Sequence, residues 1–312
     1  MVGLFRALIR GSVYKKEDRR VTLKGTIPLK ITTAVITAAA PSQRALPLQT
    51  VVDRDGVRKS VLSILVHEAS IAGAREIAVV VHPGDENAYR EALGSAGSGR
   101  VHFVPQETPR GYGHALWCAR AFVGGQPFLH LVGDHLFLAR DTGEHTAERI
   151  AALARDSDCS VSGMQPTRES LLPLFGTMGG RRVPGARDLY LIERVIEKPT
   201  PTEAEQTLTV PGLRAGHYLC FMGSHVFTPL VMELLDEHVA IASADENIQL
   251  SPILNELAQR EQYLAVEANG RRFPLDTRYG LLTAQLALAL SGEDREEVLA
   301  SLCDLLAQRE IK

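Results

Sequence analysis

Short apolar runs that alternate with longer segments of mixed polarity constrain the fold of this chain more than any other feature. Between residues 31 and 133, four runs of strand length read TTAVITAAA, EIAVVVH, VHFVP and PFLHLVG, and segments such as SVLSILVHEASIAGA and HALWCARAFVG separate them. Runs that are apolar throughout are typical of parallel strands covered by helices on both faces. The pattern predicts an α/β fold with a Rossmann-like, mixed but mostly parallel central sheet flanked by helices.

After about residue 141 the alternation loosens, and a small β insertion is expected there. HTAERIAALARDS predicts a helix, CSVSGMQP a strand and GTMGGRRVPGARD a glycine-rich turn, and LYLIERVIEKP and AGHYLCFMGSHVF are two further strand-like segments. ENIQLSPILNELAQR predicts another helix. No internal repeat or low-complexity linker interrupts the chain, so one continuous domain with an inserted second half is the expected organisation.

Three segments follow from this pattern. Residues 1–30 are expected to form an N-terminal extension, residues 31–290 the main domain, and residues 291–312 a C-terminal amphipathic helix. The apolar stripe of that helix contains Val298, Leu302, Leu305 and Leu306. We expect this stripe to pack on the body or on another subunit, as a contact in an oligomer.

Composition excludes several classes of partner. The 312 residues include 34 basic and 37 acidic side chains, a net charge of -3, which gives no global field to recruit nucleic acid or an anionic membrane. No apolar run approaches the roughly 18 residues of a membrane span. The four cysteines form no C-x-x-C pair, and a reducing cytoplasm suits them best. A discrete pocket for a small molecule is therefore the expected site.

The end of the first apolar run is a candidate nucleotide site. In an open parallel sheet, ligands lie beyond the carboxyl ends of the strands, and the loop after the first strand is the usual place for a nucleotide. Ala38 and Ala39 allow close approach of a base or a phosphate, and Arg44 offers a guanidinium group to phosphate oxygens. An ordinary strand-to-loop junction with a solvated arginine is the alternative.

Polar residues also follow two later strands. Gln106 has both a donor and an acceptor for a base edge, and Gly111 frees the backbone nearby, although that glycine could equally serve only the turn. Asp134 ends a buried strand and is well placed to hold Mg²⁺ against substrate phosphates, with Asp276 as a second carboxylate. Turn or helix-capping aspartates are the alternative.

Several of these segments, in this order, resemble the bacterial UTP-glucose-1-phosphate uridylyltransferases within the wider sugar-nucleotidyltransferase group. The resemblance covers most of the chain, about residues 33–290. It is carried by ILVHEASIAGAREIAVVVHPG, Q-x-x-x-x-G-Y-G-H-A-L from Gln106 to Leu116, Gly133-Asp134, Glu197-Lys198-Pro199, Gly216-His217-Tyr218 and DENIQLSPILNELA. Several matches in one order are far more specific than any single motif.

The resemblance implies a GT-A-like nucleotidyltransferase fold and a cytoplasmic homodimer or homotetramer. It implies synthesis of an NDP-sugar, UDP-glucose above all, and pyrophosphate from a nucleoside triphosphate and a sugar 1-phosphate with Mg²⁺. The nucleobase would contact Ala38, Ala39, Gln106 and Gly111. The sugar would contact Gly176, Glu197 and Gly216, and its phosphate Lys198. Asp134 and Asp276 would hold the metal, and Arg44, Lys198 and Asp134 would be catalytic.

One loop departs from the family. The chain has A-P-S-Q-R where the family has G-x-G-T-R, and Pro41 lacks the N–H that a phosphate cradle uses. The family's lysine after a following proline is also absent; Arg54 or Arg58 are substitutes that spacing does not establish. Two hypotheses follow: an active nucleotidyltransferase with an altered loop, or a binding protein that retains the sugar-nucleotide pocket without turnover. A GT-A glycosyltransferase is a weaker third, since Gly133-Asp134-His135 lacks D-x-D spacing.

Overall fold

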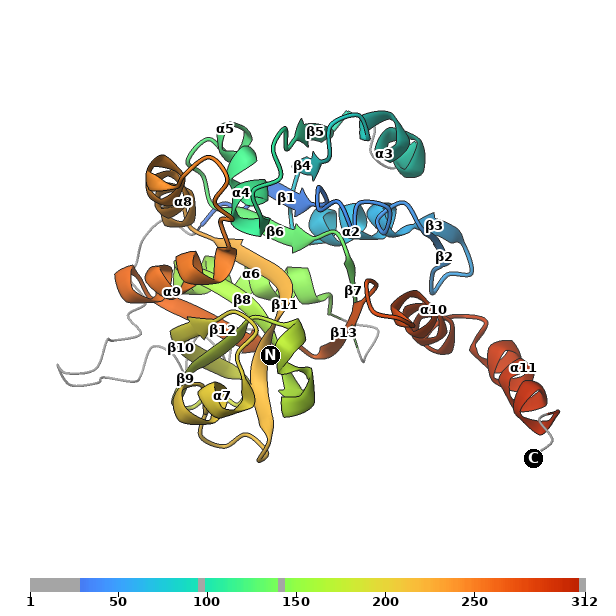
Figure 1. Cartoon of the computed structure of the whole chain (residues 1–312). Coiled ribbons are helices and arrows are strands. Elements are labelled where there is room, and N and C mark those ends of the chain that lie inside the picture. Colours follow the sequence, from blue (N-terminus) through green and yellow to red (C-terminus); the bar gives the residue numbers. More distant parts are fainter. Residues whose placement is uncertain (1–28, 95–98, 140–143, 309–312) are drawn as a thin grey trace.

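The computed structural model describes residues 29–94, 99–139 and 144–308, so nearly all of the expected N-terminal extension lies outside the described residues. A nine-stranded sheet runs through the molecule in the order β5-β4-β1-β6-β11-β8-β12-β10-β9 (Figure 1). In that order the strands are β5 (Val101–Pro105), β4 (Glu76–Val81), β1 (Thr33–Thr37), β6 (Phe128–Val132), β11 (His217–Phe227), β8 (Ser160–Arg168), β12 (Tyr263–Glu267), β10 (Leu189–Ile196) and β9 (Thr177–Arg182).

The sheet is mixed. β5, β4, β1 and β6 are mutually parallel, as are β8 and β12. β11 is antiparallel to both β6 and β8, and β10 is antiparallel to both β12 and β9. The predicted α/β class is therefore confirmed, with the continuous parallel part formed by the four strands of the first half.

Helices cover both faces of the sheet, as the wholly apolar strands predict. Ala34 and Ile36 of β1 belong to one buried cluster, whereas Val35 belongs to the other, because successive side chains of a strand point to opposite faces. The first cluster includes residues of α2 (Val61–Ile71), α6 (Thr146–Ser157) and α10 (Gly280–Leu290). The second includes residues of α4 (Tyr112–Cys118), α8 (Leu230–Ile241) and α9 (Leu250–Arg260). The remaining shorter helices are α3 (Glu86–Leu93), α5 (Arg120–Val123), α7 (Pro201–Thr207) and the 3₁₀ helix η2 (Glu169–Leu174).

Two small ribbons lie beside the main sheet. β2 (Thr50–Val52) pairs with β3 (Arg58–Ser60), and β7 (His135–Ala139) pairs with β13 (Gly270–Pro274), in both cases antiparallel. The β7–β13 ribbon joins segments from the two halves of the sequence, and its importance for the site is described below.

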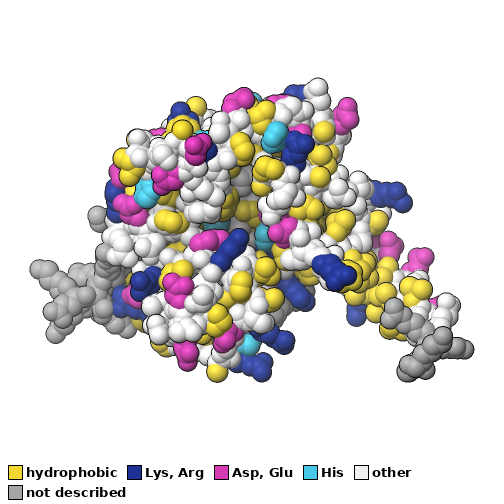
Figure 2. Space-filling model, viewed as in Figure 1, with side chains coloured by type: hydrophobic (Ala, Val, Ile, Leu, Met, Phe, Trp, Pro, Cys, Tyr) yellow, Lys and Arg dark blue, Asp and Glu magenta, His cyan; other side chains and the backbone are white. Residues whose placement is uncertain are grey.

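The last helix, α11 (Arg295–Ala307), extends away from the body (Figure 1) and has no buried residue. Leu305 and Leu306 of the expected apolar stripe are exposed, and Figure 2 shows apolar side chains over this arm and the neighbouring α10. Packing of the stripe on another subunit stays a prediction. No helix in the described ranges combines the length and apolarity needed to cross a membrane.

The glycine-rich segment 176–188 was expected to be a turn, and that prediction is wrong for its first half. Thr177–Arg182 forms the strand β9, and the turn follows it. A Cβ atom on Gly180 would lie 2.0 Å from the carbonyl oxygen of Leu191, so glycine allows the close approach of β9 to β10. The glycines therefore serve strand packing here rather than chain reversal.

Candidate functional site

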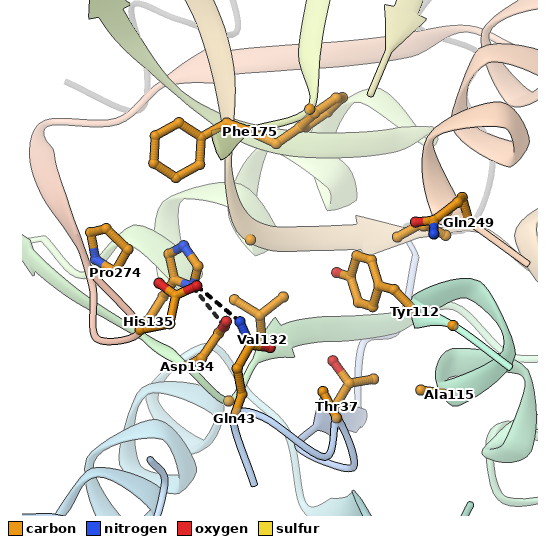
Figure 3. A pocket seen from close by; sticks show the side chains of 18 of the residues that line it. Thr37, Gln43, Tyr112, Ala115, Val132, Asp134, His135, Phe175, Gln249 and Pro274 are labelled. Carbon is orange, nitrogen blue, oxygen red and sulfur yellow. Dashed lines mark hydrogen bonds and ion pairs between the residues drawn. The ribbon is translucent and has the colours of Figure 1, made fainter. Parts of the chain in front are cut away.

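A cavity of about 570 Å³ lies at the carboxyl ends of β1 and β6. Figure 2 shows this cavity as a hollow in the front face, and Figure 3 shows its lining from close by, with ten residues labelled. All the predicted site residues except Arg44 and Gly216 line it: Ala38, Ala39, Gln106, Gly111, Asp134, Gly176, Glu197, Lys198 and Asp276. The structure thus brings together residues from both halves of the chain.

Small side chains where β1 and β6 end allow the backbones to lie close together. The N–H of Gly133 donates to the carbonyl of Thr37 at 2.9 Å, and a Cβ on Gly133 would lie 3.0 Å from the Cβ of Ala38. Ala38 and Ala39 are both buried beneath the cavity surface. A larger side chain at any of these positions would fill the space offered to a ligand.

The second half of the loop after β1 uses three backbone donors within the loop. The N–H groups of Gln43 and Arg44 both donate to the carbonyl of Ala40, at 2.9 and 2.8 Å, and that of Leu46 donates to Gln43 at 2.8 Å. Pro41 has no N–H. These residues consequently form a helical turn rather than a cradle of outward-pointing amides for phosphate.

Arg44 does not reach the cavity. Its Nη1 lies 3.3 Å from Asp85 Oδ1, and its carbonyl accepts a hydrogen bond from the Tyr89 hydroxyl at 2.7 Å. Because adjacent residues of a helical turn point about 100° apart, the side chain that lines the cavity is that of Gln43, which the sequence analysis passed over. The predicted phosphate contact of Arg44 has no support in this geometry.

Gln106 also lines the cavity, and neighbouring residues orient its side-chain amide. Its Nε2 donates to the carbonyl of Gly111 at 3.3 Å and to His114 Nδ1 at 3.0 Å. Burial lowers the pKa of His114 and favours the neutral ring that can accept this bond. The carbonyl oxygen of Gln106 is left as the group offered to a ligand.

The backbone conformation and the close packing at position 111 both require glycine. Its φ is +93°, and a Cβ there would lie 1.8 Å from Asn247 Oδ1. The loop before α4 is thereby able to pack against residues 247–249, with the N–H of Gly113 donating to Ile248 at 2.8 Å. The glycines serve this packing as well as the cavity wall.

The β7–β13 ribbon brings the two predicted metal ligands together. Pro274 pairs with His135, and the N–H of Leu275 donates to the carbonyl of Asp134 at 2.8 Å, so Asp134 and Asp276 approach the cavity from adjacent backbones. Burial by itself raises the pKa of Asp134, but the attraction and the 2.6 Å hydrogen bond of His135 Nδ1 outweigh it and lower that pKa. Asp134 is therefore a carboxylate at neutral pH.

The two carboxylates fit a hard divalent cation. Mg²⁺ is usually held by one or two carboxylates together with substrate phosphates and water. Within the described ranges, no group of three or more His, Cys, Asp or Glu side chains is arranged to hold a metal ion. An ion at Asp134 and Asp276 would thus take its other ligands from substrate and solvent.

The wall formed by Gly176, Glu197 and Lys198 is tightly built. Ser251 Oγ donates to Glu197 Oε2 at 2.5 Å, and a Cβ on Gly176 would lie 3.0 Å from the same oxygen. Lys198 has a φ of +47°, a left-handed conformation that costs a residue with a Cβ roughly 1–2 kcal/mol. Its N–H donates to the carbonyl of Phe175 at 3.2 Å, while its Nζ remains exposed, 4.0 Å from Glu197 Oε1. Strain of this kind is common at functional sites.

Gly223, rather than Gly216, lines the cavity. Gly216 lies in the turn before β11, whereas Gly223 lies where the pairing of β11 shifts between Phe221 and His225. Its φ is +81°, and a Cβ would lie 2.3 Å from Val132 Cγ2. The sequence pattern is the same at both positions, because each glycine is followed two residues later by a ring side chain, Tyr218 or His225.

A buried polar network under the cavity was also missed. His130 Nδ1 lies 3.1 Å from the carbonyl of Val35, which can only accept, so His130 Nε2 accepts from the Tyr112 hydroxyl at 2.7 Å. His225 stacks on His130 with ring centroids 5.7 Å apart. Burial lowers the pKa of His130 to about 4 and that of His225 well below its ordinary value. Tyr112 and His225 therefore give the cavity uncharged polar groups.

Charge in the cavity is mainly negative. Among its lining residues, the carboxylates of Asp134, Glu197 and Asp276 face a single lysine, Lys198. A ligand with several phosphates would thus need cations to bind here.

Comparisons with known proteins show the family of this chain. A model of the nucleotidyl transferase family matches residues 47–273, which excludes the loop with Gln43 and also Asp276. The UTP--glucose-1-phosphate uridylyltransferase of Bacillus subtilis (strain 168) is 24% identical over 308 residues, covering 90% of this chain and 99% of that protein. The protein of the same name from Streptococcus pneumoniae serotype 4 is 26% identical over 288 residues, covering 84% and 91%.

Solved structures of similar shape confirm the fold. A UDP-glucose pyrophosphorylase from Acinetobacter baumannii has a TM-score of 0.68 at 21% identity, covering 88% of this chain and 100% of that one. A UDP-glucose pyrophosphorylase complexed with UDP-glucose has a TM-score of 0.67 at 21% identity, covering 83% and 98%.

Proposed function

This chain belongs to the nucleotidyl transferase family of enzymes, and we propose that it joins a nucleoside triphosphate to a sugar 1-phosphate, forming an NDP-sugar and pyrophosphate. One observation carries the proposal: a single cavity is lined by Gln106, the carboxylates Asp134 and Asp276, and the Glu197–Lys198 pair. The names of the relatives favour UTP and glucose 1-phosphate as substrates.

The orientation of Gln106 supports uracil as the base. Its amide nitrogen is engaged by Gly111 and His114, so its carbonyl oxygen is available as an acceptor. Uracil has an N–H at ring position 3 that matches this acceptor, whereas cytosine has a lone pair there. Ala38 and Ala39 would pack against the ring.

The reaction requires alignment and charge stabilisation rather than a protein nucleophile. An oxygen of the sugar 1-phosphate attacks the α-phosphorus, a new P–O bond forms, and the bond to the bridging oxygen breaks with release of pyrophosphate. Lys198 would bind the sugar phosphate, and Glu197 and Gly176 would contact the sugar. Asp134 and Asp276 would hold Mg²⁺, which when bound would neutralise phosphate charge.

A second candidate is a sugar-nucleotide-binding protein without turnover. Three observations favour it: three loop amides are bonded within the loop, Arg44 pairs with Asp85 and does not line the cavity, and a single lysine faces three carboxylates there. A regulator or a partner of an active relative would need the pocket but not the transfer.

Pyrophosphate release tests the proposal. Purified protein with Mg²⁺ is assayed against the four common ribonucleoside triphosphates and dTTP, each with a panel of sugar 1-phosphates. We expect UTP with glucose 1-phosphate to react, and Asp134→Asn to lower the rate at least about 100-fold, as loss of one key electrostatic group commonly does. Asp236→Asn is the matched control, since Asp236 bonds Trp117 and does not line the cavity.

The outcomes separate the candidates. Silence across the panel with UDP-glucose still binding would favour the second candidate. Full activity of Asp134→Asn would remove Asp134 from the reaction. Equal thermal unfolding of both variants and the wild type would show that the comparison reports on chemistry rather than folding.

A further inference from the structure

The side chain of Gln43 has a role that the nucleotidyl-transfer proposal does not assign. Resting on that proposal, we propose that the Gln43 amide donates a hydrogen bond to the outer phosphates of the nucleoside triphosphate, in place of the loop backbone. Gln43 is then a specificity-determining residue that distinguishes a triphosphate from a monophosphate.

Among the described side chains of the loop that line the cavity, only one can donate a hydrogen bond. The other residues of the segment 38–47 that line the cavity are Ala38, Ala39, Ala40, Pro41 and Pro47. None of these side chains has a polar atom. The backbone N–H groups of Gln43, Arg44 and Leu46 are already bonded within the turn. Among the described lining residues of this segment, the Gln43 amide is thus the side-chain donor.

The amide lies where the outer phosphates are expected. Gln43 Nε2 donates to Asp276 Oδ2 at 3.0 Å. Figure 3 shows Gln43 pointing to the same part of the cavity as Asp134 and His135, across from Phe175. A cation held by Asp134 and Asp276 would take phosphate oxygens as further ligands, and those oxygens would come within reach of the amide.

One amide group can serve both partners. A glutamine Nε2 carries two N–H bonds, and the bond to Asp276 uses one of them. The second can point at a phosphate oxygen, and an N–H bonded to a charged acceptor is stronger than a neutral pair. Gln43 would therefore orient Asp276 and contact the triphosphate in the same position.

The loop is fixed from behind, so Gln43 is presented in a defined place. The buried Tyr89 hydroxyl bonds the carbonyls of Arg44 at 2.7 Å and Ala38 at 3.2 Å, and Arg44 pairs with Asp85 at 3.3 Å. Fixing a loop before binding reduces the ordering cost at the moment of binding. The contact with Gln43 would then appear largely in affinity.

Binding of three ligands tests the inference. Isothermal titration with Mg²⁺ measures the dissociation constants of UTP, UMP and UDP-glucose for the wild type and Gln43→Ala. UMP and UDP-glucose lack the two phosphates that leave as pyrophosphate. We expect Gln43→Ala to weaken UTP about tenfold, and UMP and UDP-glucose less than about twofold. Gln43→Lys, which restores an N–H donor with a positive charge, should regain the UTP affinity.

Gln49→Ala is the matched control. Gln49 belongs to the same loop, but its Nε2 donates to the carbonyl of Ala45 at 3.0 Å and it does not line the cavity. We expect this variant to keep the wild-type ratio of UTP to UMP affinity. Urea unfolding of each variant shows whether a change in binding comes from lost structure.

The results distinguish this inference from the proposed function. Equal weakening of all three ligands by Gln43→Ala, or unchanged UTP binding, overturns the role of Gln43 even in an active enzyme. A wild type that prefers UTP to UMP through Gln43 yet releases no pyrophosphate supports that role and sinks the transfer reaction. Failure of the wild type to bind UTP, together with no pyrophosphate release from any of the five triphosphates, overturns both.

Discussion

Tyr89→Phe removes a single hydroxyl from behind the loop that carries Gln43. Tyr89 is fully buried, and its hydroxyl lies 2.7 Å from the Arg44 carbonyl and 3.2 Å from that of Ala38. Burial raises the pKa of Tyr89, so the hydroxyl remains a neutral donor at every working pH. Phenylalanine keeps the ring and removes a single oxygen atom, so the main change is the loss of the hydrogen bond.

The expected loss of stability is modest. A neutral hydrogen bond contributes about 0.5–1.5 kcal/mol net, and a buried carbonyl left without a partner adds to the loss, so we expect about 1–2 kcal/mol. For a domain of this size, each kcal/mol lowers the melting temperature by roughly 2–4 °C. Urea unfolding followed by circular dichroism measures the change.

The loss in UTP binding should be specific to this tyrosine. A loosened loop no longer presents Gln43, so UTP should bind several-fold more weakly while UMP changes little. Tyr190→Phe is the control, because Tyr190 is equally buried and its hydroxyl donates to Glu267 at 3.2 Å, far from the loop in sequence and outside the cavity lining. Wild-type UTP affinity in Tyr89→Phe, or equal weakening by Tyr190→Phe, would refute this reasoning.

Three further predictions concern Lys198 in the cavity wall, Gly223 on β11 and the buried His130. In steady-state kinetics, Lys198→Ala should raise the KM for the sugar 1-phosphate far more than the KM for the triphosphate, because the Lys198 Nζ lies beside Glu197. Equal increases in the two KM values would count against Lys198 as the residue that binds the sugar phosphate. Gly223→Ala should lower the free energy of unfolding by about 2–4 kcal/mol in urea, because the new Cβ would lie 2.3 Å from Val132 and φ is +81°. Gly124→Ala is the control: its φ is +59° and no atom lies within 4 Å of the new Cβ, so the loss should be only about 1 kcal/mol. The pKa of buried His130 is lowered to about 4 from an ordinary 6.5, so the unfolded chain binds the proton more readily. Between pH 7 and pH 5 the unfolding free energy of the wild type should therefore fall by about 2 kcal/mol more than that of His130→Gln, and equal falls in the two proteins would contradict the assignment.

Sequence periodicity was sufficient for the parts of the fold whose burial is decided locally. EIAVVVH predicts the strand found at Glu76–Val81, because the five residues from Ile77 to Val81 are apolar whichever partner the strand takes, and all five are buried. The strand β9 escaped prediction because its glycines are explained only by distant segments: Gly180 by the carbonyl of Leu191 on β10, and Gly179 by the carbonyl of Thr207. The strands β7 and β13 likewise depend on partners distant in sequence.

The same distinction applies to the site. Ala38, Gln106 and Asp134 were found because the carboxyl ends of parallel strands meet at one edge of the sheet. Choosing Gln43 over Arg44 requires the hydrogen bonds of the loop, since one residue of rotation in a helical turn decides which side chain faces inward. Choosing Gly223 over Gly216 requires the shift in pairing along β11.

The ribbon of β7 and β13 sets a strict rule on chain length. Gly270 begins β13, and a Cβ there would lie 2.7 Å from the Leu138 carbonyl, which fixes how the two strands are aligned. Because side chains alternate along a strand, inserting or deleting one residue within β13 (Gly270–Pro274) would turn the residues that follow it to the other face and displace the turn that carries Asp276. Homologous chains that keep both acids are thus expected to conserve the number of residues between this glycine and the second aspartate more strictly than the residues themselves.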